Sequence, residues 1–125
     1  MYNILICDDE KDIVNALKIY LNDSNYHFLE AFDGEEAVHL VDTNEVHLVL
    51  MDIMMPNMDG HQAAKTIRAM EKERPDASSI PIIALSANAF AEDVKASVDS
   101  GMNGHISKPF DMEEVTATIA KYVKP

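Results

Sequence analysis

The chain has 125 residues, of which 22 are acidic and 10 are basic, so its formal net charge at pH 7 is −12. This length suits one domain with a buried core, and the negative charge argues against direct binding to nucleic acid or to anionic membranes. The single cysteine, Cys7, has no partner for an internal disulfide bond. No apolar stretch approaches the length of a membrane span, and the N-terminus lacks the pattern of a signal peptide, so we predict a cytoplasmic protein.

Short apolar runs alternate with longer segments of helical period, a pattern typical of a parallel sheet built from strand–helix units. The first unit is a strand at 3–7 and a helix at 11–21, where apolar residues recur at helical spacing. The second is a more polar strand at 27–32 and a short helix at 34–41. The polarity of its strand predicts a position at the edge of the sheet.

The third unit contains the most apolar strand, at 47–51, which is typical of a central strand covered on both faces. A helix at 60–73 follows, and a loop at 75–81, bounded by prolines, ends it. We therefore expect the centre of the sheet to lie at 47–51.

The last two units complete the predicted sheet. A strand at 81–86 precedes a helix at 91–100, and Gly101 suits the left-handed conformation that often follows a helix. A strand at 104–107 precedes a final helix that starts near Asp111 or Met112. The whole pattern predicts one α/β domain over 1–125, with five parallel strands and helices on both faces.

Polar side chains stand where four of these strands end. They are Asp8 and Asp9 after the first strand, Asp52 after the third, Ser86 at the end of the fourth and Lys108 after the fifth. Each has an ordinary explanation when taken alone, since an aspartate often caps the next helix and a lone serine or lysine is often only solvated. Because the carboxyl ends of parallel strands form the ligand-binding edge of such a sheet, their joint placement favours a functional site.

Three neighbouring carboxylates repel each other unless a cation lies between them. Mg²⁺ suits such a site, because it prefers oxygen ligands and is commonly held by one or two carboxylates together with phosphate oxygens. Lys108 would complete a pocket for a phosphoryl group, and Ser86 would donate a hydrogen bond to it. In this hypothesis Asp52 is a nucleophile whose product is an aspartyl phosphate.

The stretches CDDE, LMDIMMPNMDG, ALSA and SKPF, in this order and spacing, resemble the receiver domains of two-component response regulators and hybrid histidine kinases. The resemblance covers the whole chain. It implies the flavodoxin-like (βα)5 fold of a chemotaxis-type receiver, doubly wound, with a five-stranded parallel sheet. The strand order 2-1-3-4-5 is the one known for chemotaxis-type receivers and is taken from the resemblance.

The resemblance also implies a role for each pocket residue: Asp52 as phosphoacceptor, Asp8 and Asp9 as the acid pair for Mg²⁺, the Met54 carbonyl as a further metal ligand, Ser86 as the switch hydroxyl and Lys108 as the phosphate-pairing cation. Ala87 and Asn88 follow the switch serine, and Pro109 resembles a proline whose preceding peptide bond is cis in the family. Many receivers carry an aromatic switch residue where this chain has His105. Met54 is expected to shield the phosphoryl group from water, and Asn88 to offer it a polar contact.

The function implied is a phosphorylation-dependent switch. A sensor histidine kinase, a histidine phosphotransfer protein or a small phosphodonor would supply the phosphoryl group to Asp52 with Mg²⁺, and the face formed by the fourth helix, fifth strand and fifth helix would change conformation. That face would contact a downstream output domain or protein outside this chain, or mediate a homodimer. The chain would assist its own phosphorylation and dephosphorylation without being a turnover enzyme.

Other interpretations stay open on the sequence. An aspartate-nucleophile phosphatase of the haloacid dehalogenase type uses similar groups, but it expects a D-x-D motif, whereas Asp52 is followed by Ile53 and Met54. A flavin-binding module would need a phosphate loop after the first strand, where this chain is acidic. A degenerate receiver that acts as a scaffold is a further alternative. The methionines at 51, 54, 55 and 58 are either an adaptable partner surface or gap-filling packing.

Overall fold

A computed structural model of the chain describes residues 2–22, 25–55, 57–72, 80–86, 95–96, 98–108 and 110–123. Three residues of the predicted site, Ala87, Asn88 and Pro109, lie outside the described residues. So does half of the helix predicted at 91–100, in which residues 95–96 and 98–99 are described and are helical.

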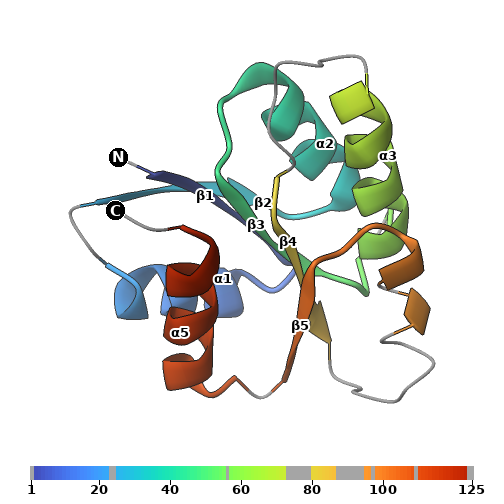
Figure 1. The fold of residues 1–125 in the computed structure, drawn as a ribbon. Coiled ribbons are helices and arrows are strands. Elements are labelled where there is room, and N and C mark those ends of the chain that lie inside the picture. The colour runs from blue at the N-terminus through green and yellow to red at the C-terminus, as the bar shows by residue number, and fades with distance from the viewer. Residues whose placement is uncertain are drawn as a thin grey trace.

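The five predicted strands form one parallel sheet in the order β2-β1-β3-β4-β5, which confirms the expected topology (Figure 1). The strands are β1 (Tyr2–Cys7), β2 (Tyr26–Ala31), β3 (Leu48–Asp52), β4 (Ile82–Ser86) and β5 (Gly104–Ser107). The order in which successive strands are added reverses at β1, which pairs with β2 on one side and with β3 on the other. In folds of this kind, ligands bind outside the carboxyl ends of the strands at such a point.

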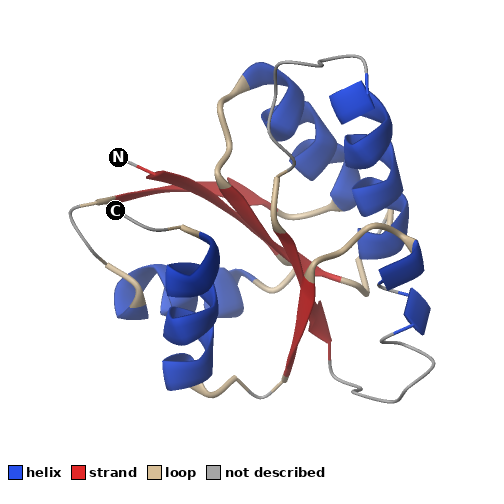
Figure 2. Cartoon of the chain, viewed as in Figure 1, coloured by secondary structure: helices blue, strands red, loops and turns tan. Residues whose placement is uncertain are grey.

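Two layers of helices cover the sheet, as Figure 2 shows. The helices are α1 (Lys11–Tyr20), α2 (Gly34–Thr43), α3 (Gly60–Lys72) and α5 (Met112–Tyr122). α1 and α5 lie on one face and α2 and α3 on the other (Figure 1). In the part of the chain that the structure describes, no helix combines the length and apolarity needed to cross a membrane.

Alternation along the strands divides the core into two apolar clusters. In β1, Ile4 and Ile6 pack toward α1 and α5, whereas Leu5 and Cys7 pack toward α2 and α3. All five residues of β3 and all five of β4 are buried, while Ala31 alone is buried in β2. The predicted central and edge positions are therefore confirmed, and they follow from how apolar each strand is.

Short-range polar contacts fix where the helices begin and end. The Asp33 side chain accepts a hydrogen bond from the Glu36 amide and caps α2, and the Asp111 side chain accepts one from the Glu113 amide and caps α5. Gly101 has a φ of 97°, which confirms the left-handed conformation expected after the helical residues 98–99.

The start of α3 approaches the end of β3 so closely that position 60 requires a glycine. The Gly60 amide donates a hydrogen bond to the Ile53 carbonyl at 2.9 Å, which brings the start of α3 against the end of β3. A β-carbon at this position would collide with the carbonyl oxygen of Asp52. The close approach therefore requires glycine and holds the backbone of Asp52 in place.

Candidate functional site

Three charged side chains meet at the carboxyl end of the sheet. The Lys108 ammonium lies 3.0 Å from Oδ2 of Asp8 and 3.4 Å from Oδ1 of Asp52. Asp8 and Asp52 are both buried, with 0% and 3% of their surface exposed. The sequence predicted this convergence, and the structure brings these three residues together.

Backbone hydrogen bonds between neighbouring strands place these groups. The amide of Asp8, directly after β1, donates to the Ala31 carbonyl at the end of β2. Asp52 is the last residue of β3 and pairs with Leu85. The Lys108 amide, directly after β5, donates to the Ser86 carbonyl at 2.7 Å. The sheet register thus carries the three charged groups to one edge.

Asp8 has few protein partners for a fully buried carboxylate. Its Oδ1 accepts a hydrogen bond from the Glu10 amide at 2.9 Å. Its Oδ2 is buried, and the Lys108 ammonium at 3.0 Å is its close cationic neighbour. A buried carboxylate oxygen in this position is a strong candidate for interaction with a second cation.

The environment makes the charge on Asp52 costly. Burial, and next the negative charge of Asp8, raise the pKa of Asp52 from 3.8 to about 7, although Lys108 partly opposes them. Burial by itself would lower the pKa of Lys108, but its hydrogen bonds and charge interactions with Asp8 and Asp52 raise that pKa above its ordinary value. A divalent cation at this edge would stabilise the ionised form of Asp52.

The residues present fit such a cation. Carboxylate oxygens of Asp8, Asp9 and Glu10 all lie within 4.8 Å of one another, Asp8 being buried and the other two exposed. Hard oxygen donors of this kind suit Mg²⁺. The capping explanation for Asp9 is wrong, because the N-cap of α1 is Glu10 and no side chain caps that helix. Glu10 was missed by the sequence analysis, although it stands in the same CDDE stretch.

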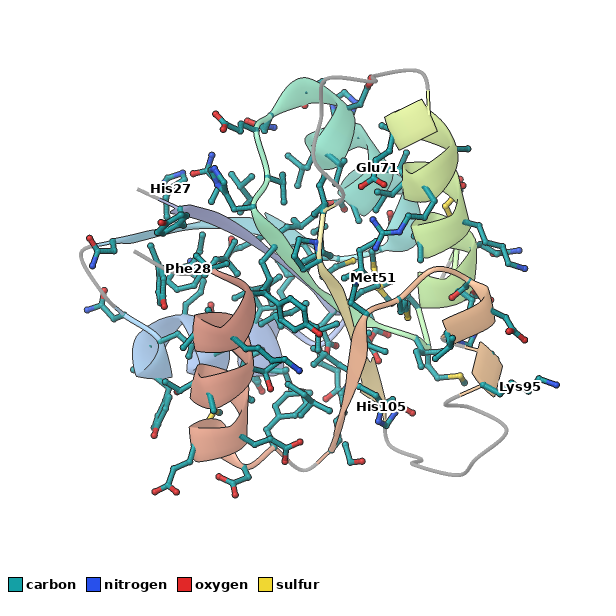
Figure 3. The ribbon with its side chains drawn as sticks, in the orientation of Figure 1. His27, Phe28, Met51, Glu71, Lys95 and His105 are labelled. Atoms are coloured by element: carbon teal, nitrogen blue, oxygen red, sulfur yellow. The ribbon has the colours of Figure 1, made fainter. Side chains whose placement is uncertain are left out.

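The remaining predicted residues lie on the same side of the molecule or on strands that lead to it. Ser86 ends β4 and is 6% exposed, and it pairs with Ser107 of β5. Met54 follows β3 with 77% of its surface exposed. His105 lies on β5, the strand that leads to Lys108 (Figure 3), and its Nε2 is buried without a hydrogen bond to the described residues.

A polar link beside the site was not predicted. Asn57, in the loop after β3, has a φ of 65° and donates from Nδ2 to Oδ2 of Asp33 at 2.9 Å. Because Asp33 also caps α2 through Glu36, it connects that helix to the loop that follows Asp52. The spacing of Asp33 and Glu36 is typical of a helix start and would have indicated the cap.

Comparison with known proteins identifies the family of this chain. The family model for the response regulator receiver domain matches residues 4–120. Response regulator GtcR of Aneurinibacillus migulanus is 38% identical over 93% of this chain, which spans 45% of the length of that relative. The chain therefore corresponds to less than half of that protein.

Two solved structures have closely similar folds. The receiver domain of Ssk1 from Saccharomyces cerevisiae, solved with the histidine phosphotransfer signalling protein Ypd1, has a TM-score of 0.92 and 28% identity, with 97% of this chain and 88% of that chain covered. The receiver domain of sensor histidine kinase PA1611 from Pseudomonas aeruginosa PAO1, solved with a magnesium ion in its active site cleft, has a TM-score of 0.84 and 30% identity, with 97% and 96% covered. The chain belongs to the response regulator receiver domain family, the signalling domains of two-component systems.

Proposed function

We propose that residues 1–125 form a single receiver domain that accepts a phosphoryl group on Asp52. The observation that carries this proposal is the ion-paired cluster in which Lys108 lies 3.4 Å from a buried Asp52 and 3.0 Å from a buried Asp8. A buried carboxylate beside a fixed cation is suited to attack an electrophile that carries several negative charges.

In the proposed reaction, an Asp52 carboxylate oxygen attacks the phosphorus of a phosphohistidine. The new P–O bond forms as the P–N bond breaks, and the departing imidazole takes up a proton. Lys108 pairs with the phosphoryl oxygens, and Ser86 donates a hydrogen bond to one of them. Water later cleaves the acyl phosphate, releases inorganic phosphate and restores Asp52.

The same proposal assigns a magnesium site to this edge. Asp8, Asp9, Asp52 and the Met54 carbonyl would hold Mg²⁺, and exposed Glu10 lies beside Asp8 and Asp9. When bound, Mg²⁺ neutralises charge on the phosphoryl oxygens and lowers the repulsion between the carboxylates. The magnesium in the PA1611 receiver supports the assignment.

The phosphodonor in this proposal is a phosphohistidine of a sensor histidine kinase or of a histidine phosphotransfer protein. The complex of the Ssk1 receiver with Ypd1 supports a protein donor of this kind. The domain would act in the cytoplasm, and it would turn over its own phosphoryl group without processing a separate substrate. An aspartate-nucleophile phosphatase is not favoured, because both the fold and the family match are those of a receiver.

Phosphorylation would shift a balance between two conformations. Ser86, Ala87 and Asn88 would move toward the phosphoryl group, Pro109 would orient Lys108, and His105 would respond on β5. The altered face around β5 and α5 would bind a downstream output domain or protein, or form a homodimer. If the His105 ring resonances in NMR do not shift on phosphorylation, His105 is not part of the switch.

Transfer from a phosphorylated histidine phosphotransfer protein tests the proposed function. The donor is labelled with ³²P, freed of its kinase and mixed with this domain and Mg²⁺. We expect the label to leave the donor and to appear on this chain, and we expect Asp52→Asn to take up none. A folded domain that acquires no label from any phosphohistidine donor would instead be a scaffold that keeps the pocket without the chemistry.

A further inference from the structure

The sulfur-containing side chains are unevenly distributed between the core and the solvent. The chain has eight methionines and one cysteine. Six of these residues belong to or pack against the core between the sheet and helices α2 and α3: Cys7, Met51, Met55, Met58, Met70 and Met102. Figure 3 shows Met51 within the body of the molecule. Met112 packs against the core on the opposite face.

Met54 differs from the other described methionines. It is 77% exposed, whereas Met51 is 0% and Met102 is 5% exposed, and the remaining methionines of the described ranges are partly buried. Peroxides reach a thioether from solvent, so reactivity follows exposure. Among the described methionines, Met54 is therefore the one that an oxidant should modify first.

Cys7 is not a competing target, although it lies beside the acidic site. It is fully buried, and its Sγ donates to the Asp33 carbonyl at 3.4 Å and lies 3.2 Å from Sδ of Met55. Burial, with the charges of Asp52 and Asp8, raises the pKa of its thiol far above the ordinary value. The reactive thiolate is thus suppressed.

Hydrogen bonds fix the backbone next to Met54, whereas the Met54 side chain is exposed to solvent. The Ile53 amide donates to the Leu85 carbonyl at 3.1 Å, and the Ile53 carbonyl accepts from the Gly60 amide at 2.9 Å. Ile53 itself is 8% exposed. A change confined to the Met54 side chain therefore occurs two residues after Asp52 without unpacking the core.

We propose that Met54 is a site of reversible oxidation by peroxides, and that its oxidation shortens the lifetime of the phosphoryl group on Asp52. The second part rests on the proposed function. With hydrogen peroxide, the thioether sulfur attacks one oxygen and the O–O bond breaks. The other oxygen takes up the proton that the attacked oxygen loses and leaves as water. The sulfur is oxidised by two electrons to a sulfoxide, and the peroxide is reduced by the same two. Methionine sulfoxide reductases reverse this step.

The expected effect follows from polarity. An unmodified Met54 offers water only an apolar side chain near Asp52, whereas a sulfoxide is polar and accepts hydrogen bonds. Water is then better held beside the acyl phosphate, so hydrolysis speeds up. We expect the half-life of the aspartyl phosphate to fall severalfold.

Peptide mapping by mass spectrometry after graded treatment with hydrogen peroxide tests the modification site. We expect Met54 to gain one oxygen well before the partly buried methionines and before Cys7, and we expect sulfoxide reductases to remove it. Equal oxidation of Met54 and Met70 in the folded protein would overturn the assignment. This measurement requires no phosphorylation, so it stands apart from any failure of the proposed function.

The functional part is tested by the rate of phosphate release from protein labelled at Asp52, with and without prior oxidation. The rate of phosphate release from untreated Met54→Leu is the baseline for this variant, and peroxide should no longer change that rate. Met70→Leu, a matched change on α3, should keep the full response to peroxide. An unchanged half-life in protein oxidised at Met54, or a retained peroxide response in Met54→Leu, would overturn the proposed effect on the phosphoryl lifetime.

Discussion

The ammonium group of Lys108 lies 3.0 Å from Oδ2 of Asp8, nearer than the 3.4 Å that separates it from Oδ1 of Asp52. Asp8 is fully buried and Lys108 is its close cationic neighbour, so this ion pair offsets the cost of the buried carboxylate. A metal ion at the same carboxylates would compete with the lysine for Asp8. The lysine therefore has two roles to test, as counter-ion in the metal-free domain and as the proposed partner of the phosphoryl group.

Replacing the lysine should separate these roles. We expect Lys108→Met to bind Mg²⁺ severalfold more tightly, because the competing cation is gone, and to be phosphorylated far more slowly. Titration calorimetry with MgCl₂ gives the affinity. Lys18→Met is the control, since it removes a lysine that pairs with Glu30 at 2.7 Å on the surface of the domain. Weaker Mg²⁺ binding by Lys108→Met than by Lys18→Met would contradict the competition.

The stability of the metal-free domain should depend on pH through Asp52. The pKa of Asp52 is about 7 in the folded protein against an ordinary 3.8, so between these values the unfolded chain has released a proton that the folded protein keeps. The contribution of Asp52 to the free energy of unfolding is therefore highest below about pH 4 and is lost as pH rises to about 7, by up to a few kcal/mol at about 1.4 kcal/mol per pKa unit.

Urea denaturation in EDTA at several pH values measures this effect. Asp52→Asn cannot ionise, so we expect it to be more stable than the wild type at pH 7 and above, with the difference shrinking toward pH 4. Adding Mg²⁺ should stabilise the wild type more than the variant. A difference between the two proteins that stays constant from pH 4 to 8 would show that the charge on Asp52 costs nothing.

Gly60 should tolerate no side chain. Gly60→Ala places a methyl group against the Asp52 carbonyl, so we expect the free energy of unfolding to fall by about 2 kcal/mol or more. Gly104→Ala is a matched control, because its β-carbon would meet the terminal methyl of Ile83 at 3.1 Å, and a side chain of this kind can shift. Equal losses of unfolding free energy in the two variants, measured by urea denaturation, would refute the claim that position 60 requires glycine.

Arg68 should stabilise the end of the sheet opposite the proposed site. Its guanidinium donates to the Gly101 carbonyl at 2.9 Å, to Oδ1 of Asn103 at 2.7 Å and to Oε1 of Glu71 at 2.8 Å. Figure 3 shows Glu71 on α3. Arg68→Met leaves these acceptors short of a donor, and we expect a loss of roughly 2 kcal/mol.

This loss should come without any change in the phosphorylation of Asp52. Arg68→Lys should recover little of the stability, since an ammonium cannot reproduce the fork of donors. Thermal unfolding and acetyl phosphate labelling, measured on the same samples, check both expectations. A variant of normal stability would mean that water replaces the guanidinium at no cost.

The strands themselves and the meeting of Asp8, Asp52 and Lys108 could be predicted because both depend on local patterns, whereas the order of the strands came from the family resemblance. Apolar runs mark the strands, and a polar residue that follows a strand must lie at the carboxyl edge of a parallel sheet. The predicted strand limits differ from those observed by one residue at most, as at β3, where Asp52 itself belongs to the strand.

Other features could not be predicted, because they depend on contacts between residues far apart in the chain. Nothing around Arg68 indicates that its partners are Gly101 and Asn103, which lie 33 and 35 residues away. Met51 and Met54 are the same residue type and lie close together in the sequence. Met51 is nevertheless buried in the core and Met54 is exposed, because the chain leaves the sheet between them. The packing interpretation is thus confirmed for Met51, Met55 and Met58, and Met54 is the exception.

The most direct test of the central claim is intact mass spectrometry after incubation with acetyl phosphate and Mg²⁺. The wild-type domain is run beside Asp52→Asn and beside a wild-type sample in EDTA. We predict that one phosphoryl group is added to the wild type with Mg²⁺ and to neither control. Addition of a phosphoryl group to Asp52→Asn, or equal addition with and without Mg²⁺, would contradict the assignment of Asp52 as the metal-assisted phosphoacceptor.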